Sequence, residues 1–166
     1  MLPAYLPNPV AALTGGGTPV DFSRNYTDGR RIFGDGKTWR GLIVGIFAGV
    51  GIGTIQILAA DAWGIRFLPG LTFPAVILLA TGALLGDLVK SFFKRRCGVE
   101  RGAKWPIADQ YDLVAGAFLL LLIFDSAWLF SRVTLPVFII ILILTPILHR
   151  VVNIIGFAIK VKEVPW

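Results

Sequence analysis

The sequence has very few of the residues that build disulfides or zinc sites. Its 166 residues include one cysteine, Cys97, and one histidine, His149. A single cysteine excludes an intramolecular disulfide, and one cysteine with one histidine cannot supply the ligands of a conventional zinc site. His149 stands at the end of an apolar run, where a role at the membrane interface is expected. Metal chemistry in this chain would therefore have to rely on carboxylates.

Charged residues are scarce as well, and they are absent from long stretches. Only 16% of the residues are charged, 55% are hydrophobic and the mean hydropathy is +0.75. Four segments are long and apolar enough to cross a hydrocarbon core of about 30 Å as helices. These predicted spans are 41–60, 68–86, 113–130 and 133–148. The sequence therefore predicts an all-α, polytopic integral membrane protein, with one domain over residues 1–166.

The N-terminal segment lacks both the basic start and the unbroken apolar stretch of a secretory signal peptide. Residues 1–13 are apolar, but the segment is short and is interrupted by Pro3, Pro7 and Pro9. It is compatible with a partial fifth helix and with a segment that lies at the membrane interface. The sequence leaves this choice open.

Polar groups are nearly missing from the predicted spans. Gln56 and a few threonines are the main ones near the middle of a span, whereas Asp61 and Asp125 fall towards span ends, where they can reach the interface. A transporter usually needs polar groups near the middle of the bilayer. The pattern favours chemistry at the membrane surface over transport, with structural or solvated roles for both aspartates.

Basic residues are concentrated in alternate connections between the spans. Residues 15–40 carry five, residues 87–112 carry six and the C-terminal tail carries three, whereas the two intervening turns carry one each. Cytoplasmic loops of membrane proteins are enriched in lysine and arginine. The first loop (15–40), the central loop (87–112) and the tail are therefore predicted on the cytoplasmic side of the cell membrane. The net charge of +6 is explained by this bias and by anionic lipids, without a nucleic-acid partner.

The central loop combines acidic and basic side chains in a pattern that suits Mg²⁺ and phosphate. If the second span continues as a helix, its residues Asp87, Lys90, Ser91 and Lys94 share one face. Asp109 and Asp112 share a face at the start of the third span. The three aspartates could hold one or two Mg²⁺ ions. Simpler explanations are acids that favour a helix N-terminus and lysines that anchor topology.

The first loop combines glycines with cations. Backbone amides of a glycine-rich loop can cradle phosphate oxygens, and arginine or lysine can add charge-assisted hydrogen bonds. Gly36-Lys37-Thr38 resembles the end of a Walker A loop, but position 31 of that pattern is arginine and no strand is expected before it, so we reject a P-loop. An ordinary flexible loop is the alternative.

Both loops carry motifs of a known family. The block Asp87-Leu-Val-Lys-Ser-Phe-Phe-Lys-Arg95, with Gly98, Pro106 and Asp109-Gln-Tyr-Asp112, resembles the signature of the membrane CTP:phosphatidate cytidylyltransferases, or CDP-diacylglycerol synthases. The first loop, with Gly-Gly-Gly-Thr-Pro-Val-Asp-Phe and Asp-Gly-Arg-Arg, resembles more specifically the archaeal branch, the CDP-archaeol synthases. Two departures from the bacterial pattern are Ile107-Ala108, where Gly-His-Gly-Gly usually stands, and Lys90, where glutamate is usual.

The resemblance implies a reaction and a set of site residues. CTP and unsaturated archaetidic acid (2,3-bis-O-geranylgeranylglycerol 1-phosphate) would give CDP-archaeol and pyrophosphate with Mg²⁺. The metal would be held by Asp87, Asp109 and Asp112, and phosphates of CTP or the lipid would be contacted by Ser91, Lys94 and Arg95. The nucleotide site would be completed from the first loop by Gly15, Gly16, Gly17, Thr18, Asp21, Asp28, Arg30, Arg31 and Lys37. A homodimer would be unsurprising for this family.

Two other functions remain compatible with the residues themselves. A different membrane phosphotransferase, such as a polyprenol kinase, would use the same metal and phosphate groups. A non-catalytic scaffold that binds anionic membrane lipids would need the cations but not the paired acids, so its binding would survive loss of all three aspartates.

Overall fold

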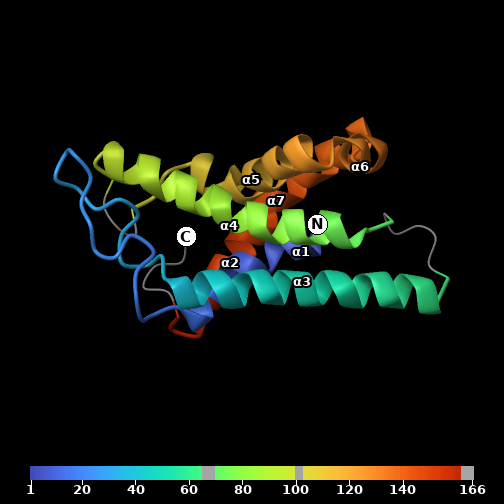
Figure 1. Cartoon of the computed structure of the whole chain (residues 1–166), viewed down its shortest axis with the longest axis horizontal. Coiled ribbons are helices and arrows are strands. Elements are labelled where there is room, and N and C mark those ends of the chain that lie inside the picture. Colours follow the sequence, from blue (N-terminus) through green and yellow to red (C-terminus); the bar gives the residue numbers. More distant parts are fainter. Residues whose placement is uncertain (65–69, 100–102, 162–166) are drawn as a thin grey trace.

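The computed structural model describes residues 1–64, 70–99 and 103–161, and its regular elements are helices (Figure 1). The described residues form no β-strand. They contain two isolated bridges, Pro19 with Thr38 and Asn25 with Arg31, both in the first loop. The all-α prediction is confirmed. The helices are α1 (Leu2–Tyr5), α2 (Pro7–Thr14), α3 (Trp39–Ala62), α4 (Phe73–Arg96), α5 (Ala108–Phe124), α6 (Ser126–Arg132) and α7 (Leu135–Ala158).

Three of these helices, α3, α4 and α7, are long and apolar enough to cross a membrane. Threonine side chains begin the first two. Thr38 Oγ1 accepts a hydrogen bond from Gly41 N at 3.2 Å, and Thr72 Oγ1 accepts one from Ala75 N at 3.3 Å. The helix α4 continues to Arg96, well beyond the predicted end at position 86. The first part of the central loop is therefore helical, as its one-faced pattern suggested.

The predicted third span, 113–130, is wrong as one continuous helix. α5 begins earlier, at Ala108, and ends at Phe124, and α6 follows it. Asp125 separates the two helices with a non-helical backbone (φ −151°, ψ 56°), and its carboxylate accepts a hydrogen bond from Trp128 N at 3.3 Å. Aspartate is a good N-cap because its side chain satisfies an amide that has no partner in the first turn. Asp125 thus has a structural role.

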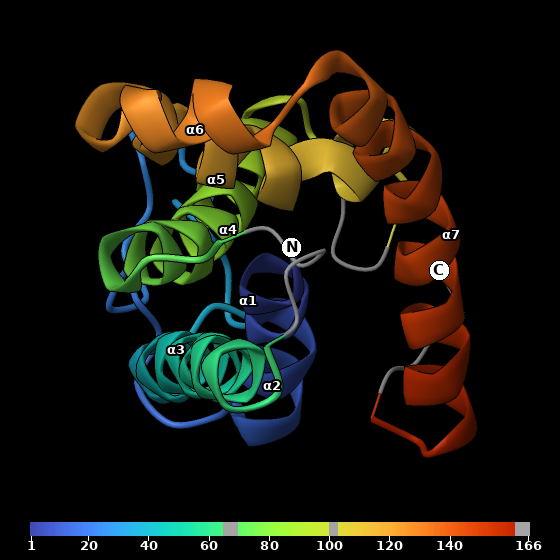
Figure 2. The same ribbon diagram turned by 90° about the vertical axis from the view of Figure 1, so that its right-hand side faces the viewer.

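The last helix is longer than the predicted span, 133–148, because Pro146 does not end it. A proline cannot donate to the carbonyl oxygen four residues earlier, which here is Leu142 O. Tyr111 Oη donates to that oxygen instead, at 2.9 Å. Figure 2 looks nearly along α3 and α4, and α7 runs across that view, so it is steeply inclined to both.

The N-terminal segment forms a short helical pair, α1 and α2, inside the molecule. It packs along glycines of α3 that are buried at Gly41, Gly45, Gly49 and Gly53. A Cβ atom at Gly49 would lie 2.6 Å from Pro3 O, so only glycine permits this approach. At 1.5 Å per residue the pair reaches only about 20 Å, which is short of a bilayer core. The pair packs beside α3 from Gly41 to Gly53.

Glycines also bring α4 and α5 together. A Cβ atom at Gly82 would lie 2.6 Å from Gly116 O, and one at Gly86 would collide with the carbonyl oxygen of Asp112. Small residues allow helix backbones to approach closely in membranes. The crossing occurs one residue before Asp87, so it places the acid of α4 directly beside the acids at the start of α5.

Candidate active site

A cavity of about 410 Å³ lies among α1, α2, α4, α5, α7 and the first loop. The first loop and the end of α4 meet at one end of the molecule (Figure 1), and residues of both line this cavity. Its polar lining includes residues from both predicted loops: Lys37, Asp87, Lys90, Ser91, Lys94, Arg95, Asp109 and Asp112. The prediction that Asp87, Lys90, Ser91 and Lys94 share one helix face is therefore confirmed, and the two loops meet on one side.

Lys90 lies at the centre of the three aspartates. Its Nζ is 3.0 Å from Asp87 Oδ1, 2.7 Å from Asp112 Oδ2 and 3.4 Å from Asp109 Oδ1. The predictions did not assign Lys90 to the site. Its position on the predicted helix face, one turn after Asp87, was the signal that could have included it.

Two further lysines complete the cluster from either side. Lys37, in the first loop, pairs with Asp87 Oδ2. Lys94 Nζ donates to both oxygens of Asp109, each at 3.0 Å. Asp87, Lys94 and Asp112 are all at most 9% exposed. The cluster thus joins three carboxylates and three ammonium groups, and its formal charges balance.

Backbone amides hold two of the aspartates. Trp105 N donates to Asp109 Oδ2 at 2.7 Å, and Leu113 N donates to Asp112 Oδ1 at 2.6 Å. Asp109 lies in the first turn of α5, where amides without partners in the helix favour an acidic side chain, whereas Asp112 lies one turn further along. Each acid is therefore oriented by a different backbone amide at or near the start of α5.

Asp21 organises the first loop from a buried position. It accepts hydrogen bonds from Phe33 N and Gly34 N, both at 3.0 Å, and from the guanidinium of Arg31 at 2.6 Å. Burial alone would raise the pKa of Asp21, but the Arg31 hydrogen bond and the two amides outweigh it and lower the pKa from 3.8 to about 2. Asp21 and Arg31, both predicted near the nucleotide, thus shape the loop that carries Lys37.

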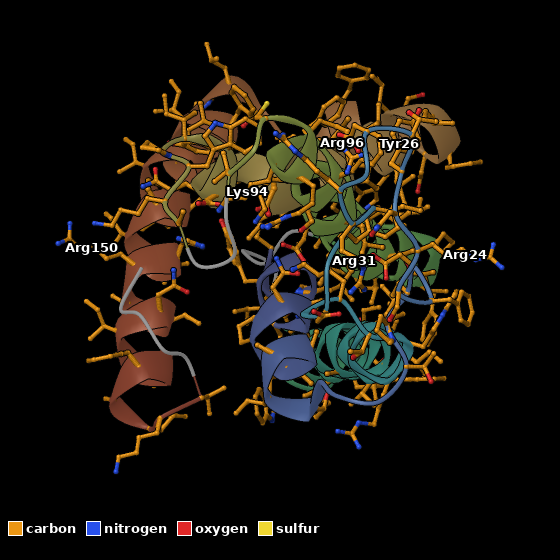
Figure 3. The ribbon with its side chains drawn as sticks, turned by 90° about the vertical axis from the view of Figure 1, so that its left-hand side faces the viewer. Arg24, Tyr26, Arg31, Lys94, Arg96 and Arg150 are labelled. Atoms are coloured by element: carbon orange, nitrogen blue, oxygen red, sulfur yellow. The ribbon has the colours of Figure 1, made fainter. Side chains whose placement is uncertain are left out.

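Arg30 and Asp28 contact the end of α4. Arg30 Nη1 donates to Arg95 O and Arg96 O, and Asp28 Oδ1 pairs with Arg96 Nη1 at 2.8 Å. The Arg96 guanidinium also lies over the ring of Tyr26, 4.8 Å from its centroid. Figure 3 shows Arg96 and Tyr26 side by side, with Arg24 projecting outwards. These groups attach the loop to the helix.

The glycine stretch predicted to cradle phosphate lies at the start of α3. Gly15 O accepts a hydrogen bond from Arg40, and Thr18 O accepts one from Trp39 N at 3.1 Å. The residues Gly15, Gly16, Gly17 and Thr18 are not among those that line the cavity, whereas Phe33 and Gly36 of the same loop are. Their contact with nucleotide stays a prediction.

The opposite wall of the cavity carries polar residues that the predictions missed. Thr145, His149 and Asn153 lie on one face of α7, at intervals of four residues, and they face the cavity together with Tyr5 and Asn8. Tyr5 Oη and Thr145 Oγ1 are 2.8 Å apart, and Asn153 Nδ2 is 3.3 Å from the His149 ring nitrogens. The four-residue spacing was a signal for this face. His149 lines the cavity.

The carboxylate ligands of the cluster fit a hard divalent cation. In the present arrangement, however, they do not form an open position for one. Within the described residues, no group of three histidine, cysteine or acidic side chains is arranged to bind a metal ion. Carboxylate oxygens are the ligands that Mg²⁺ prefers. The oxygens of Asp87, Asp109 and Asp112 already converge on one cation, the Lys90 ammonium.

Comparisons with known proteins cover the whole chain. A family model described as CarS-like, CDP-archaeol synthase, matches residues 1–166. The chain is 66% identical to the CDP-archaeol synthase of Methanoregula boonei and 62% identical to that of Methanoculleus marisnigri, in each case over 166 residues and 100% of both chains. It is 47% identical to the CDP-archaeol synthase of Methanosarcina barkeri over 177 residues.

A solved structure has a similar fold. It is described as an intramembrane enzyme for archaeal membrane lipids biosynthesis. The TM-score is 0.66 and the sequence identity is 34%, with coverage of 98% of this chain and 90% of that chain. The likeness therefore extends over almost the whole of this chain.

Proposed function

The chain belongs to the CarS-like CDP-archaeol synthase family, and we propose that it transfers CMP from CTP to unsaturated archaetidic acid, giving CDP-archaeol and pyrophosphate. A phosphate oxygen of the lipid attacks the α-phosphorus of CTP. A new P–O bond forms, the bond from the α-phosphorus to the bridging oxygen breaks, and pyrophosphate leaves with that bonding pair. The attacking oxygen is already anionic near neutral pH, so the step needs no general base.

The observation that carries this proposal is the cluster of three lysines and three aspartates at one end of a membrane helix bundle. Nucleotidyl transfer requires little covalent help from a protein, because its main demands are charge stabilisation and alignment. Lys37, Lys90 and Lys94 come from the first loop and from two successive turns of α4. They can therefore contact phosphate oxygens from different directions.

The carboxylates of Asp87, Asp109 and Asp112 are the groups that would hold Mg²⁺. When bound there, the ion would neutralise charge on the transferring phosphoryl group and align the two substrates. The protein's own part is to orient these acids. The ammonium groups of Lys90 and Lys94 and the amides of Trp105 and Leu113 serve that purpose.

The cavity also has an apolar side that suits a lipid substrate. Leu113, Leu148 and Val152 line it next to the charged cluster. α7 and α3 expose many large apolar side chains, as expected for surfaces in contact with lipid tails. A lipid phosphate can thus reach the cluster while its chains remain among apolar groups. Its isoprenoid tails would leave towards the membrane.

We place the active site on the cytoplasmic face of the cell membrane. The first loop, the end of α4 and the start of α5 carry most of the basic residues, which favours this side. CTP is a cytoplasmic nucleotide, so this orientation gives it direct access. The family membership favours nucleotidyl transfer over the kinase and scaffold alternatives. A homodimer remains an expectation from the family.

The direct test is product formation by the purified protein in detergent. Wild type is incubated with Mg²⁺, α-labelled CTP and 2,3-bis-O-geranylgeranylglycerol 1-phosphate, and CDP-lipid and pyrophosphate are measured. Wild type should form CDP-lipid and pyrophosphate in equal amounts. In Asp112→Asn the rate of product formation should fall at least a hundredfold. Asp61→Asn, which makes the same change at an exposed position on α3, should remain active. Absence of CDP-lipid from wild type, with ether and ester phosphatidates alike, would contradict the proposal.

A further inference from the structure

The ammonium of Lys90 occupies the point on which the three site carboxylates converge. Nζ is within 3.0 Å of Asp87 and Asp112 and 3.4 Å from Asp109. The side chain is 15% exposed, and that of Asp112 is 4% exposed. A metal ion held by all three acids would therefore have to displace this ammonium or share the carboxylates with it.

The charge balance of the cluster makes that replacement unfavourable for a metal ion alone. The three aspartates are matched by Lys37, Lys90 and Lys94. If Mg²⁺ displaced Lys90, the buried ammonium would lose all three of its carboxylate partners. A buried charge without a partner is strongly unfavourable, so the ammonium resists displacement.

A nucleotide changes this situation because it supplies new partners for the lysines. Lysine is a compact charge on a flexible four-carbon stem, so it can turn from a carboxylate to a nearby phosphate without movement of the helix. Lys90 and Lys94 both line the cavity with Asp87 and Asp109. The phosphates of CTP would accept the ammonium groups, and the freed carboxylates would accept the metal ion.

We propose that Lys90 closes the metal position until nucleotide binds, so that Mg²⁺ and CTP bind as a strongly coupled pair. This inference rests on the proposed function, because it takes CTP as the nucleotide. Lys90 then has two successive roles. It neutralises the acids of the empty site, and it contacts phosphate in the loaded site. By linkage, each ligand must raise the affinity for the other by the same factor.

The first experiment measures the metal alone, so that nucleotide cannot chelate it. Mn²⁺ binding to the purified protein is followed by electron paramagnetic resonance without CTP. Wild type should bind Mn²⁺ weakly, and Lys90→Gln should bind it at least tenfold more tightly. Lys90→Met is a second variant, which removes the same charge with an apolar side chain of similar length. If both folded variants bind Mn²⁺ no more tightly than wild type, the inference is wrong.

The matched control separates position from net charge. Lys37→Gln removes the same charge from the same cluster, but of the three site carboxylates Lys37 pairs with that of Asp87, at the edge of the cluster and away from the point of convergence. A simple charge effect would raise Mn²⁺ affinity equally in Lys37→Gln and Lys90→Gln. The proposal requires a clearly larger increase in Lys90→Gln, and equal increases would overturn it.

The second experiment measures coupling in the other direction. Binding of labelled CTP is compared with and without Mg²⁺, before any lipid is added. The ratio of the two affinities should be large in wild type and at least tenfold smaller in Lys90→Gln. CDP-lipid formation by wild type in the same preparation tests the proposed function separately. Product formation with unchanged coupling in Lys90→Gln would overturn only the role of Lys90.

Discussion

Arg30 and Arg96 each donate hydrogen bonds to the backbone that carries the other. Arg30 Nη1 is 3.2 Å from Arg95 O and 2.9 Å from Arg96 O, and Arg96 Nη2 is 3.2 Å from Arg30 O and 2.6 Å from Arg31 O. The last carbonyl groups of a helix lack partners within it, and Arg30 satisfies two of them. This reciprocal pair attaches the first loop to the end of α4. The same loop carries Lys37, which pairs with Asp87.

The first prediction concerns this attachment. Arg96→Ala should detach the first loop, because it removes two hydrogen bonds to carbonyls, the ion pair with Asp28 and the stacking on Tyr26. Hydrogen bonds to charged groups contribute about 1.5–3 kcal/mol each. We expect a KM for CTP at least tenfold higher and faster proteolysis within residues 15–38. Both can be measured on the detergent-solubilised protein.

Two variants make the first prediction specific. Arg96→Lys should show nearly the same increase in KM and in proteolysis as Arg96→Ala, because an ammonium cannot reproduce the planar, multi-donor contact of a guanidinium. Arg24→Ala removes the same side chain type from an exposed position in the same loop and should leave the KM unchanged. Normal protease resistance and normal KM in Arg96→Ala would show that the loop is held by other contacts.

The second prediction concerns the close approach of α4 and α5. A Cβ atom at Gly86 would collide with Asp112 O, so Gly86→Ala must push the two helices apart. Overpacking of this kind typically costs about 1–3 kcal/mol. The thermal unfolding midpoint should fall, and activity should fall further, because the displacement separates Asp87 from Asp112. Gly51→Ala is the control, since a Cβ there meets nothing within 4 Å on α3.

The third prediction concerns pH. The pKa of Asp21 is about 2 in the folded protein, below its ordinary value of 3.8. A depressed folded-state pKa contributes stability that is present above the unfolded pKa and is lost as pH falls towards 2. Asp21→Asn should therefore be less stable than wild type by about 2 kcal/mol at neutral pH, and the difference should shrink below about pH 4.

Unfolding midpoints of wild type and Asp21→Asn between pH 2.5 and pH 7 provide the measurement. Asp61→Asn makes the same charge change at an exposed site and is the control for the effect of net charge. A penalty for Asp21→Asn that is as large at pH 2.5 as at pH 7 would mean that the carboxylate charge is not the source of the effect.

The fourth prediction concerns Tyr111 and Pro146. Tyr111 Oη donates to Leu142 O at 2.9 Å, the carbonyl oxygen that Pro146 cannot reach with a backbone N–H. Tyr111→Phe should cost about 1 kcal/mol, the usual net value of a hydrogen bond. In the background of Pro146→Ala, the alanine amide can satisfy Leu142 O, so the same Tyr111→Phe change should cost much less. Unfolding of the four proteins gives this double-mutant cycle. Additive effects would show that the two residues act independently.

Much of the fold could be predicted from hydropathy. The runs that became α3, α4 and α7 were identifiable because a bilayer core demands about 20 apolar residues. The break at Asp125 was missed because an N-cap depends on backbone dihedral angles that hydropathy does not report. The place of α1 and α2 was open because their stability comes from contact with the glycines of α3, which lie far away in sequence.

Seven of the residues predicted for the site lie together in the structure. Asp87, Asp109, Asp112, Ser91, Lys94, Arg95 and Lys37 line one cavity. Arg30 and Asp21 were assigned to the nucleotide site by resemblance to the family, yet in the structure they make contacts that build the loop. Thr145, His149 and Asn153 were missed because they stand in a strongly apolar helix.

The sequence by itself determined that this protein is helical, that it belongs in a membrane and that two charged loops share one side. These are properties of local composition and order along the chain, so they require no knowledge of contacts. Only the tertiary structure decided that Lys90 stands among three carboxylates and that α7 completes the cavity. The reason is geometric, because both depend on how closely α4 and α5 cross at Gly86 and on the inclination of α7, which arise from packing between distant residues.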